Sequence, residues 1–236
     1  MKENYYLCTS YTERSGLLAF ALQAHTEVAE CLQQHKSHNS MEVAIIKYNA
    51  GNIYSVVNAL SRLGVTPILT DDAERIKSAD HVLFPGQGEA SGAMKYLKER
   101  NLHTLIKDLK QPLLGICIGQ QLLCRHSEEG DTDCIGVFPV DVHRFTPKCH
   151  ADKVPAMGWN NIYDYQSDLF KDLTPDEYVY FVHSFYVPEC EFTAAKAHYI
   201  QPYSAALHKD NFYATQFHPE KSGAVGEKII SNFLAL

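Results

Sequence analysis

The sequence contains no Cys-x-x-Cys pair, no long run of basic residues and no apolar run that approaches the length of a membrane span. Its seven cysteines, an odd number without such a pair, argue against a disulfide framework or a structural zinc site and favour a reducing cytosol. The net charge of −7 disfavours nucleic acid or an anionic membrane as a partner. We therefore expect a cytoplasmic protein.

The sequence also lacks repeats, low-complexity tracts and a clean linker, so we expect residues 41–236 to form one domain. Residues 1–40 differ from the rest because they are rich in Gln, His, Ser and Thr without strand alternation or glycine turns. Met41, in contrast, opens directly into an apolar strand pattern. We expect residues 1–40 to be an appended or upstream-translated segment outside the catalytic fold, partly helical from Leu17 to Gln34. A regulatory or assembly extension is the alternative.

Strand and helix patterns alternate from Met41 to Cys117, which predicts a parallel sheet with helices on both faces and functional residues at the carboxyl ends of its strands. After Gly136 the segments become shorter and more aromatic, and we expect antiparallel or mixed strands added to the sheet. The fold class is therefore α/β. The expected strands are 43–47, 65–69, 80–84, 113–116, 137–145, 161–165, 178–182, 194–199, 205–208 and 212–216, and the expected helices are 52–63, 90–109 with a break near Asn101, the first turns at 120–126, and 222–236.

A cysteine lies between two glycines where the strand 113–116 meets the next helical pattern, in Gly115-Ile116-Cys117-Ile118-Gly119. This spacing is that of a nucleophile elbow, a strained strand-to-helix turn in which larger side chains two positions away would collide. The sulfur would lie exposed near a helix N-terminus, which favours the thiolate. The N–H of Ile118 is then a candidate oxyanion donor. A buried cysteine in an α/β crossover explains this motif alone equally well.

A base with its own orienting group follows far downstream, in His218-Pro219-Glu220. Residues two apart in extended backbone face the same way, so the Glu220 carboxylate can reach the His218 ring and fix its tautomer. Together with Cys117 these residues supply a nucleophile, a base and an orienting acid, which indicates acyl transfer through a thioester. His183 is the rival base, but it has Phe185 rather than a carboxylate two residues on. A solvated loop pair is the structural alternative for His218 and Glu220.

These residues resemble the class I, triad-type glutamine amidotransferases, and within them the glutaminase subunits of imidazole glycerol phosphate synthase. The resemblance runs from Met41 to Leu236. The cysteine elbow and the His-Pro-Glu segment mark the superfamily. The more specific signal for the subfamily is Val154-Pro155-Ala156-Met157-Gly158-Trp159-Asn160. Further matching segments are residues 48–52, 84–88, 114–121, 180–186 and 216–222.

The resemblance implies roles for several further residues. The backbone amides at Gln87 and Ile118 would form the oxyanion hole, although many relatives have valine where Gln87 stands. The implied substrate-binding residues are Gly88, Gln121, Ser184 and Phe185. An ordinary glycine turn, a surface helix residue and a turn-forming serine are the structural alternatives for Gly88, Gln121 and Ser184.

The resemblance also implies a partner, the (β/α)₈ cyclase subunit, which receives ammonia through its barrel, and it implies no metal or organic cofactor. The matching interface positions are Asn52, Trp159, Tyr180 and Lys221. Ala156 departs from the histidine common at that position. The glutaminase of anthranilate, aminodeoxychorismate or carbamoyl phosphate synthesis is one alternative, and a non-catalytic interaction protein with the same fold is another.

Overall fold

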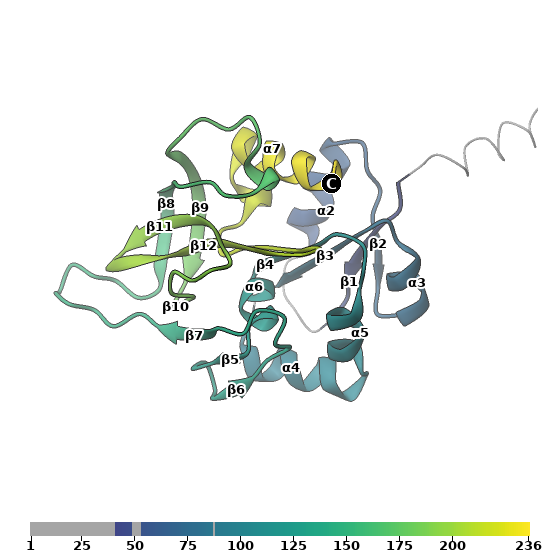
Figure 1. Cartoon of the computed structure of the whole chain (residues 1–236), viewed down its shortest axis with the longest axis horizontal. Coiled ribbons are helices and arrows are strands. Elements are labelled where there is room, and N and C mark those ends of the chain that lie inside the picture. Colours follow the sequence, from purple (N-terminus) through teal and green to yellow (C-terminus); the bar gives the residue numbers. More distant parts are fainter. Residues whose placement is uncertain (1–40, 49–52, 87) are drawn as a thin grey trace, which may run out of the picture. The chain divides into compact units, whose positions relative to one another are not determined.

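The computed structural model describes residues 41–48, 53–86 and 88–236. Its central sheet has seven strands in the order β11-β12-β13-β4-β3-β1-β2 (Figure 1). Strands β2, β1, β3, β4 and β13 run parallel, and β12 and β11 continue the sheet antiparallel. The sheet strands are β1 (Val43–Ile46), β2 (Ile68–Thr70), β3 (His81–Gly86), β4 (Leu113–Cys117), β11 (Thr193–Tyr199), β12 (Gln201–Lys209) and β13 (Phe212–Thr215). The expected α/β class with antiparallel strands in the C-terminal half is confirmed.

Helices cover both faces of this sheet, as Figure 1 shows. The helices α2 (Tyr54–Arg62) and α7 (Gly223–Leu234) lie on one face. On the other lie α3 (Ala73–Ser78), α4 (Ala90–Glu99), α5 (Leu102–Asp108) and α6 (Ile118–Leu123). The break between α4 and α5 falls where expected, at Asn101, whose φ of 54° is left-handed. In the part of the chain that the structure describes, no helix is both long and apolar enough to cross a membrane.

Two smaller sheets stand beside the central one, which the sequence patterns did not predict. The strands β5 (His126–Ser127), β6 (Thr132–Asp133), β7 (Asp141–Arg144) and β10 (Phe185–Tyr186) form a four-stranded sheet. A separate hairpin pairs β8 (Ala156–Ile162) with β9 (Glu177–His183). Short 3₁₀ helices, η1 (Asp168–Phe170) and η2 (Pro219–Lys221), complete the elements.

Several expected boundaries are wrong. The strand expected at 65–69 is β2, which begins at Ile68, the strand expected at 137–145 covers only β7, and helix α3 was not expected. The helix expected over 120–126 begins at Ile118 and ends at Leu123, because Cys124 turns extended and the Arg125 N–H bonds to the Val140 carbonyl. The strand expected at 161–165 instead spans 156–162, where it pairs residue by residue with β9. Gly158 and two adjacent asparagines give this segment weak strand propensity, so its pairing comes from the tertiary structure.

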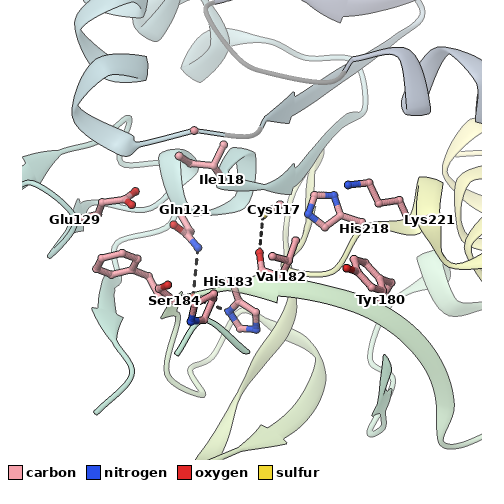
Figure 2. Close-up of a pocket in the computed structure, with 13 residues that line it drawn as sticks. Cys117, Ile118, Gln121, Glu129, Tyr180, Val182, His183, Ser184, His218 and Lys221 are labelled. Atoms are coloured by element: carbon pink, nitrogen blue, oxygen red, sulfur yellow. Dashed lines mark hydrogen bonds between the residues drawn. The ribbon is translucent and has the colours of Figure 1, made fainter. Parts of the chain in front are cut away.

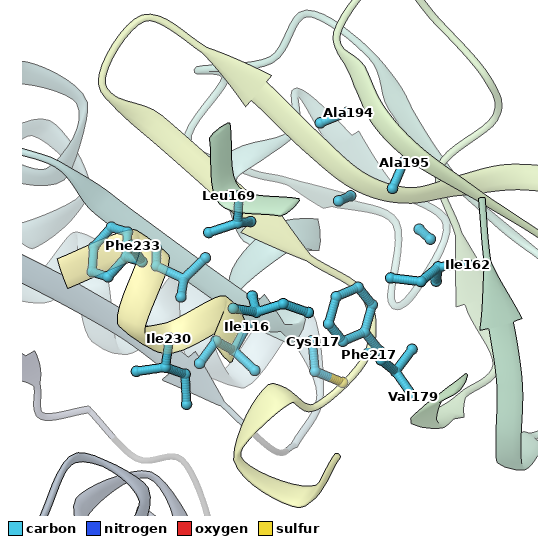
Figure 3. Packing of buried hydrophobic residues seen from close by; sticks show 14 of the residues in the cluster. Ile116, Cys117, Ile162, Leu169, Val179, Ala194, Ala195, Phe217, Ile230 and Phe233 are labelled. Carbon is cyan, nitrogen blue, oxygen red and sulfur yellow. The ribbon is translucent and has the colours of Figure 1, made fainter. Parts of the chain in front are cut away.

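The core consists of two apolar layers, one on each face of the central sheet. Alternation along β4 sends Leu114 and Ile116 to the layer under α2 and α7, whereas Leu113 joins the layer under α3 to α6. Figure 3 shows the first layer, in which Ile116 packs near Ile230 and the Cys117 side chain lies at its edge. Cys117 is therefore attached to a strand that is buried along its whole length.

His81 is one of the buried histidines through which we expect the fold to be sensitive to acid. His81, at the start of β3, is 6% exposed and packs edge-on against Phe233 of α7. Neither of its ring nitrogens has a hydrogen-bond partner among the described residues. Burial lowers the pKa of His81, an effect that the neighbouring Asp80 opposes more weakly.

We predict that His81→Leu makes the free energy of unfolding less dependent on pH between 7 and 5. The unfolded chain binds a proton at His81 near pH 6.5 and the folded chain only at lower pH, so stability is present above 6.5 and declines as the pH falls. The loss attributable to His81 reaches at most about 1.4 kcal/mol per pH unit. Urea unfolding of both proteins at several pH values measures it, and parallel pH profiles would contradict the assignment.

Candidate active site

Cys117 ends β4 and immediately precedes α6, at the carboxyl edge of the parallel strands. Its backbone has φ 55° and ψ −108°, a conformation that a non-glycine residue adopts only when its surroundings enforce it. Gly86, at the end of β3, is its direct neighbour in the sheet register. The structure therefore places the cysteine on a sharp strand-to-helix turn, as the Gly-x-Cys-x-Gly spacing predicts.

The two flanking glycines are required by close backbone approach. A Cβ atom at Gly119 would lie 1.9 Å from the carbonyl oxygen of Phe84 in β3. A Cβ atom at Gly115 would lie 2.8 Å from Leu123 Cδ1 and 3.0 Å from the carbonyl group of Gly119. A side chain at either position would collide with these groups, so the sharp turn from β4 into α6 requires glycine at both positions.

His218 and Glu220 form a buried pair. The His218 Nδ1 atom lies 2.7 Å from Glu220 Oε1, and the two side chains are only 2% and 3% exposed. The carboxylate accepts a hydrogen bond from the Nδ1–H group, which leaves Nε2 as the atom that exchanges a proton. Nε2 is buried and has no hydrogen-bond partner among the described residues. Figure 2 shows the His218 ring beside Cys117.

Opposing effects set the protonation of His218. Burial lowers the pKa of His218, but its interactions with the Cys117 thiolate and the Glu220 carboxylate outweigh burial and raise the value to about 9. The imidazole therefore holds its proton at neutral pH when the cysteine beside it is ionised. A thiolate–imidazolium pair is an activated nucleophile with a proton donor already in place for a leaving group.

The Cys117 sulfur has two further polar neighbours. Gln216 Nε2 donates to Sγ over 3.7 Å. The Val182 carbonyl oxygen lies 3.8 Å from Sγ, a contact that Figure 2 marks with a dashed line. Gln121, one turn into α6, donates its amide N–H to Gln216 Oε1 at 2.9 Å and to the Phe185 carbonyl at 3.4 Å. Gln216 was not among the residues expected from the sequence. Its signals are its position two residues before His218 and its place in the matching segment 216–222.

A pocket of about 480 Å³ opens in front of the cysteine. It brings together most of the residues that the sequence singled out, including two expected at a partner interface, Tyr180 and Lys221. The other expected residues in its lining are Gly88, Cys117, Ile118, Gln121, Ser184, Phe185 and His218. Trp159 does not line this pocket. It lies on β8, 57% exposed, with its ring edge-on to Tyr180. Gln87 and Asn52 lie outside the described residues.

One carboxylate in the pocket was not expected. Glu129 follows β5 and lines the pocket, where its Oε2 accepts a hydrogen bond from the Ala90 N–H at 2.9 Å. Burial raises the pKa of Glu129, and the bond from Ala90 partly offsets the rise. Figure 2 shows Glu129 on the same side of the pocket as Gln121, with Lys221 on the opposite side. No local pattern distinguishes it from Glu128, so only the fold reveals it.

His183, the rival base, also lines the pocket but is already engaged. Its Nδ1 bonds to the Phe185 carbonyl at 2.7 Å, and its Nε2 lies 3.3 Å from the Tyr203 hydroxyl. Burial lowers the pKa of His183 to about 4, so the ring is neutral at pH 7. The geometry favours His218 as the partner of Cys117. Within the described residues, no three His, Cys, Asp or Glu side chains are grouped to hold a metal ion.

Comparisons with known proteins agree with this geometry. A family model described as glutamine amidotransferase class-I matches residues 44–236. The imidazole glycerol phosphate synthase subunit HisH of Bacteroides fragilis YCH46 is 64% identical over 196 residues, which are 83% of this chain and 100% of the relative. The HisH subunit of Escherichia coli K12 is 42% identical over 198 residues, with the same two coverages. In fold, the chain resembles a GMP synthase subunit protein from Thermoplasma acidophilum, with a TM-score of 0.64, 20% identity, and coverage of 84% of this chain and 94% of that one.

We predict that Gly119→Ala destabilises the protein by about 1–3 kcal/mol or more and slows alkylation of Cys117, because the new methyl group overlaps the Phe84 carbonyl. Gly92→Ala is the matched control, since its Cβ would meet only Glu89 Oε2, at 3.6 Å, within helix α4. That change should be neutral or stabilise by up to about 1 kcal/mol. Urea unfolding and iodoacetamide labelling measure both effects. Equal stability and labelling in the two variants would refute the steric role of Gly119.

Proposed function

The chain belongs to the class I glutamine amidotransferases, and from that premise we propose that Cys117, His218 and Glu220 carry its glutaminase reaction as the glutaminase subunit of imidazole glycerol phosphate synthase. The single observation that carries the assignment of roles is the juxtaposition of Cys117 with a buried His218–Glu220 pair at the floor of a pocket. The identity of 64% with a HisH subunit over its whole length supports the synthase.

The reaction begins with the thiolate of Cys117, which attacks the side-chain amide carbon of glutamine. The imidazolium of His218 then gives its proton to the departing ammonia, and a glutamyl thioester remains on the sulfur. Water, deprotonated by His218, adds to the thioester carbon. The C–S bond breaks, the electron pair stays on sulfur, and glutamate leaves. Glu220 keeps the Nδ1 proton of His218 in place throughout.

The negative oxygen that forms at each addition needs donors near Cys117. The Ile118 N–H is the first amide of α6 and lies beside the nucleophile, which supports its role as one donor. We assign the second donor to the amide at Gln87, from the resemblance and from its position directly after Gly86, the sheet neighbour of Cys117.

The other pocket residues suit the amino-acid end of glutamine. We propose that Gly88, Gln121, Ser184 and Phe185 contact the substrate, because all four line the pocket that holds Cys117. Glu129 adds the feature that the sequence did not suggest, a carboxylate able to pair with the α-ammonium group of the substrate. The pocket thus offers a negative group at one end and the nucleophile at the other.

The relatives are named as subunits of a synthase, which implies a partner subunit. We propose that this partner is the cyclase and that it covers the β8–β9 hairpin. Met157 and Trp159 are two residues apart on β8 and therefore share a face of the strand. They are 68% and 57% exposed, so two large apolar side chains project from the same face. Tyr180 and Lys221 extend this surface to the pocket itself. Ammonia released at Cys117 would then leave towards the partner.

We predict that Cys117→Ala lowers glutamine-dependent synthesis by the complex on the order of 10⁴-fold or more, whereas synthesis from added ammonia continues. The alanine variant keeps the fold but has no nucleophile. Cys149→Ala is the control, because Cys149 is exposed and lies outside the pocket. Product formation with each nitrogen source measures the effect. Near-normal use of glutamine by the Cys117 variant would disprove the assignment, and co-purification with a different synthase would redirect it.

We predict that Trp159→Ala weakens binding of the cyclase by about 2 kcal/mol, or roughly 30-fold in Kd, because exposed tryptophans are frequent anchors of protein interfaces. Leu69→Ala is the control, since Leu69 is 45% exposed on the opposite edge strand β2. Titration calorimetry with the purified cyclase compares the two. An unchanged affinity in the Trp159 variant would remove the hairpin from the interface without affecting the roles of the triad.

A further inference from the structure

A directed chain of hydrogen bonds connects the substrate end of the pocket to the nucleophile. It starts at the Phe185 carbonyl, which accepts from Gln121 Nε2 at 3.4 Å. The same Gln121 nitrogen donates to Gln216 Oε1 at 2.9 Å. The Gln216 Nε2 atom then donates to Cys117 Sγ at 3.7 Å. Gln216 is fully buried, so no water competes for its amide.

The direction of this chain is fixed at its first member. A backbone carbonyl can only accept, so Gln121 must turn its NH₂ group towards Phe185. That NH₂ group then also meets Gln216, which must present its oxygen in return. The Gln216 NH₂ group is left to face the sulfur. The Phe185 carbonyl is itself held by His183 Nδ1 at 2.7 Å, so the starting point is anchored.

The backbone also holds Gln216 in place. Its N–H bonds to the Ala205 carbonyl of β12 at 2.8 Å, which fixes the residue at the end of β13. If the Gln216 side-chain amide were turned over, its oxygen would face the Cys117 thiolate and repel it. The observed orientation instead aims an N–H at the atom that becomes negative.

We propose that Gln216 is a positioning residue that donates a hydrogen bond to the Cys117 thiolate in an orientation enforced by Gln121. The proposal deepens the proposed glutaminase function, on which its kinetic consequences rest. No proton moves through Gln216. The thiol proton goes to His218 Nε2, and the Gln216 N–H stabilises the charge that remains on sulfur. The same bond stabilises the sulfur as a leaving group when the thioester C–S bond breaks.

Gln120 provides an internal contrast. It precedes Gln121 in α6, is equally buried, and its amide reaches the Ser204 carbonyl at 3.5 Å rather than the cysteine. A substitution at Gln120 therefore perturbs α6, the helix that carries Gln121, but removes no hydrogen-bond donor from the Cys117 sulfur. Gln120→Met is a matched control for Gln216→Met, since both replace a buried amide by an unbranched side chain of similar length.

The test is the pH dependence of Cys117 alkylation by iodoacetamide in the full chain. Peptide mass spectrometry separates Cys117 from the other cysteines, and Cys117→Ala supplies the background. We expect Gln216→Met and Gln216→Leu to raise the pH midpoint by about one unit each, so that the alkylation rate well below both midpoints falls about tenfold. Gln120→Met should leave the midpoint within about 0.2 units, an order-of-magnitude bound for a group that does not touch the sulfur.

An unchanged midpoint in both Gln216 variants would overturn the proposal, as would equal shifts in the Gln216 and Gln120 variants. Different shifts in the Met and Leu variants would point to packing rather than to a lost donor, and would count against it too. If neither Gln216 variant folds, Gln121→Met decides. The proposal requires a raised midpoint there, because the Gln216 amide loses the group that orients it.

Alkylation needs neither glutamine nor a partner, so the two proposals fail separately. A wild-type protein that never releases glutamate from glutamine, with or without the cyclase, would refute the proposed function and leave the thiolate contact standing. Normal glutamine turnover together with an unshifted midpoint in the Gln216 variants would do the opposite.

Discussion

The active site depends on one close contact between backbones, that of Gly119 against the Phe84 carbonyl. Helix α6 leaves β4 so steeply that its second residue passes β3 at a distance where no Cβ atom fits. This crossing holds Cys117 at φ 55°, with its side chain at the edge of the apolar layer under α2 and α7, where it also borders the pocket. The strain is sustained because β4 lies between β3 and β13 and is paired with both.

Two histidines in the same pocket show how partners, rather than burial, decide protonation. Burial lowers the pKa of both His183 and His218. His183 faces a backbone carbonyl and a tyrosine hydroxyl, which offer little compensation, and its pKa falls to about 4. His218 lies between a thiolate and a carboxylate, and its pKa rises to about 9. One ring therefore serves as a fixed neutral support while the other can carry charge.

Sequence patterns predicted the parts of this site whose geometry is local. The Cys117 elbow and the His218–Glu220 pair each span a few residues, so spacing alone determines what can approach what. Gln216 and Glu129 were not predicted, because each acquires its place by tertiary packing: Gln216 meets Gln121 across 95 positions of the chain, and Glu129 bonds to Ala90 across 39. The same distinction holds for the fold. Most of the alternation before Cys117 was predicted, although the short helix α3 was missed and β2 begins three residues later than expected. In contrast, β8 takes its boundaries from β9 and could not be placed from its own residues.

The base and the exposed hairpin share hydrogen bonds, which links the triad physically to the surface proposed for the partner. The backbone N–H of His218 donates to the Tyr180 carbonyl at 2.9 Å. The Ser222 hydroxyl donates to the His218 carbonyl at 2.6 Å and accepts from the backbone N–H of Tyr180 at 3.0 Å. Tyr180 and His218 are thus joined by a direct bond and by one shared hydroxyl. A partner that moves the Tyr180 backbone must also move the backbone that carries His218. The connection runs through backbone atoms and the Ser222 hydroxyl, so it reaches the residue that carries the base without involving the cysteine.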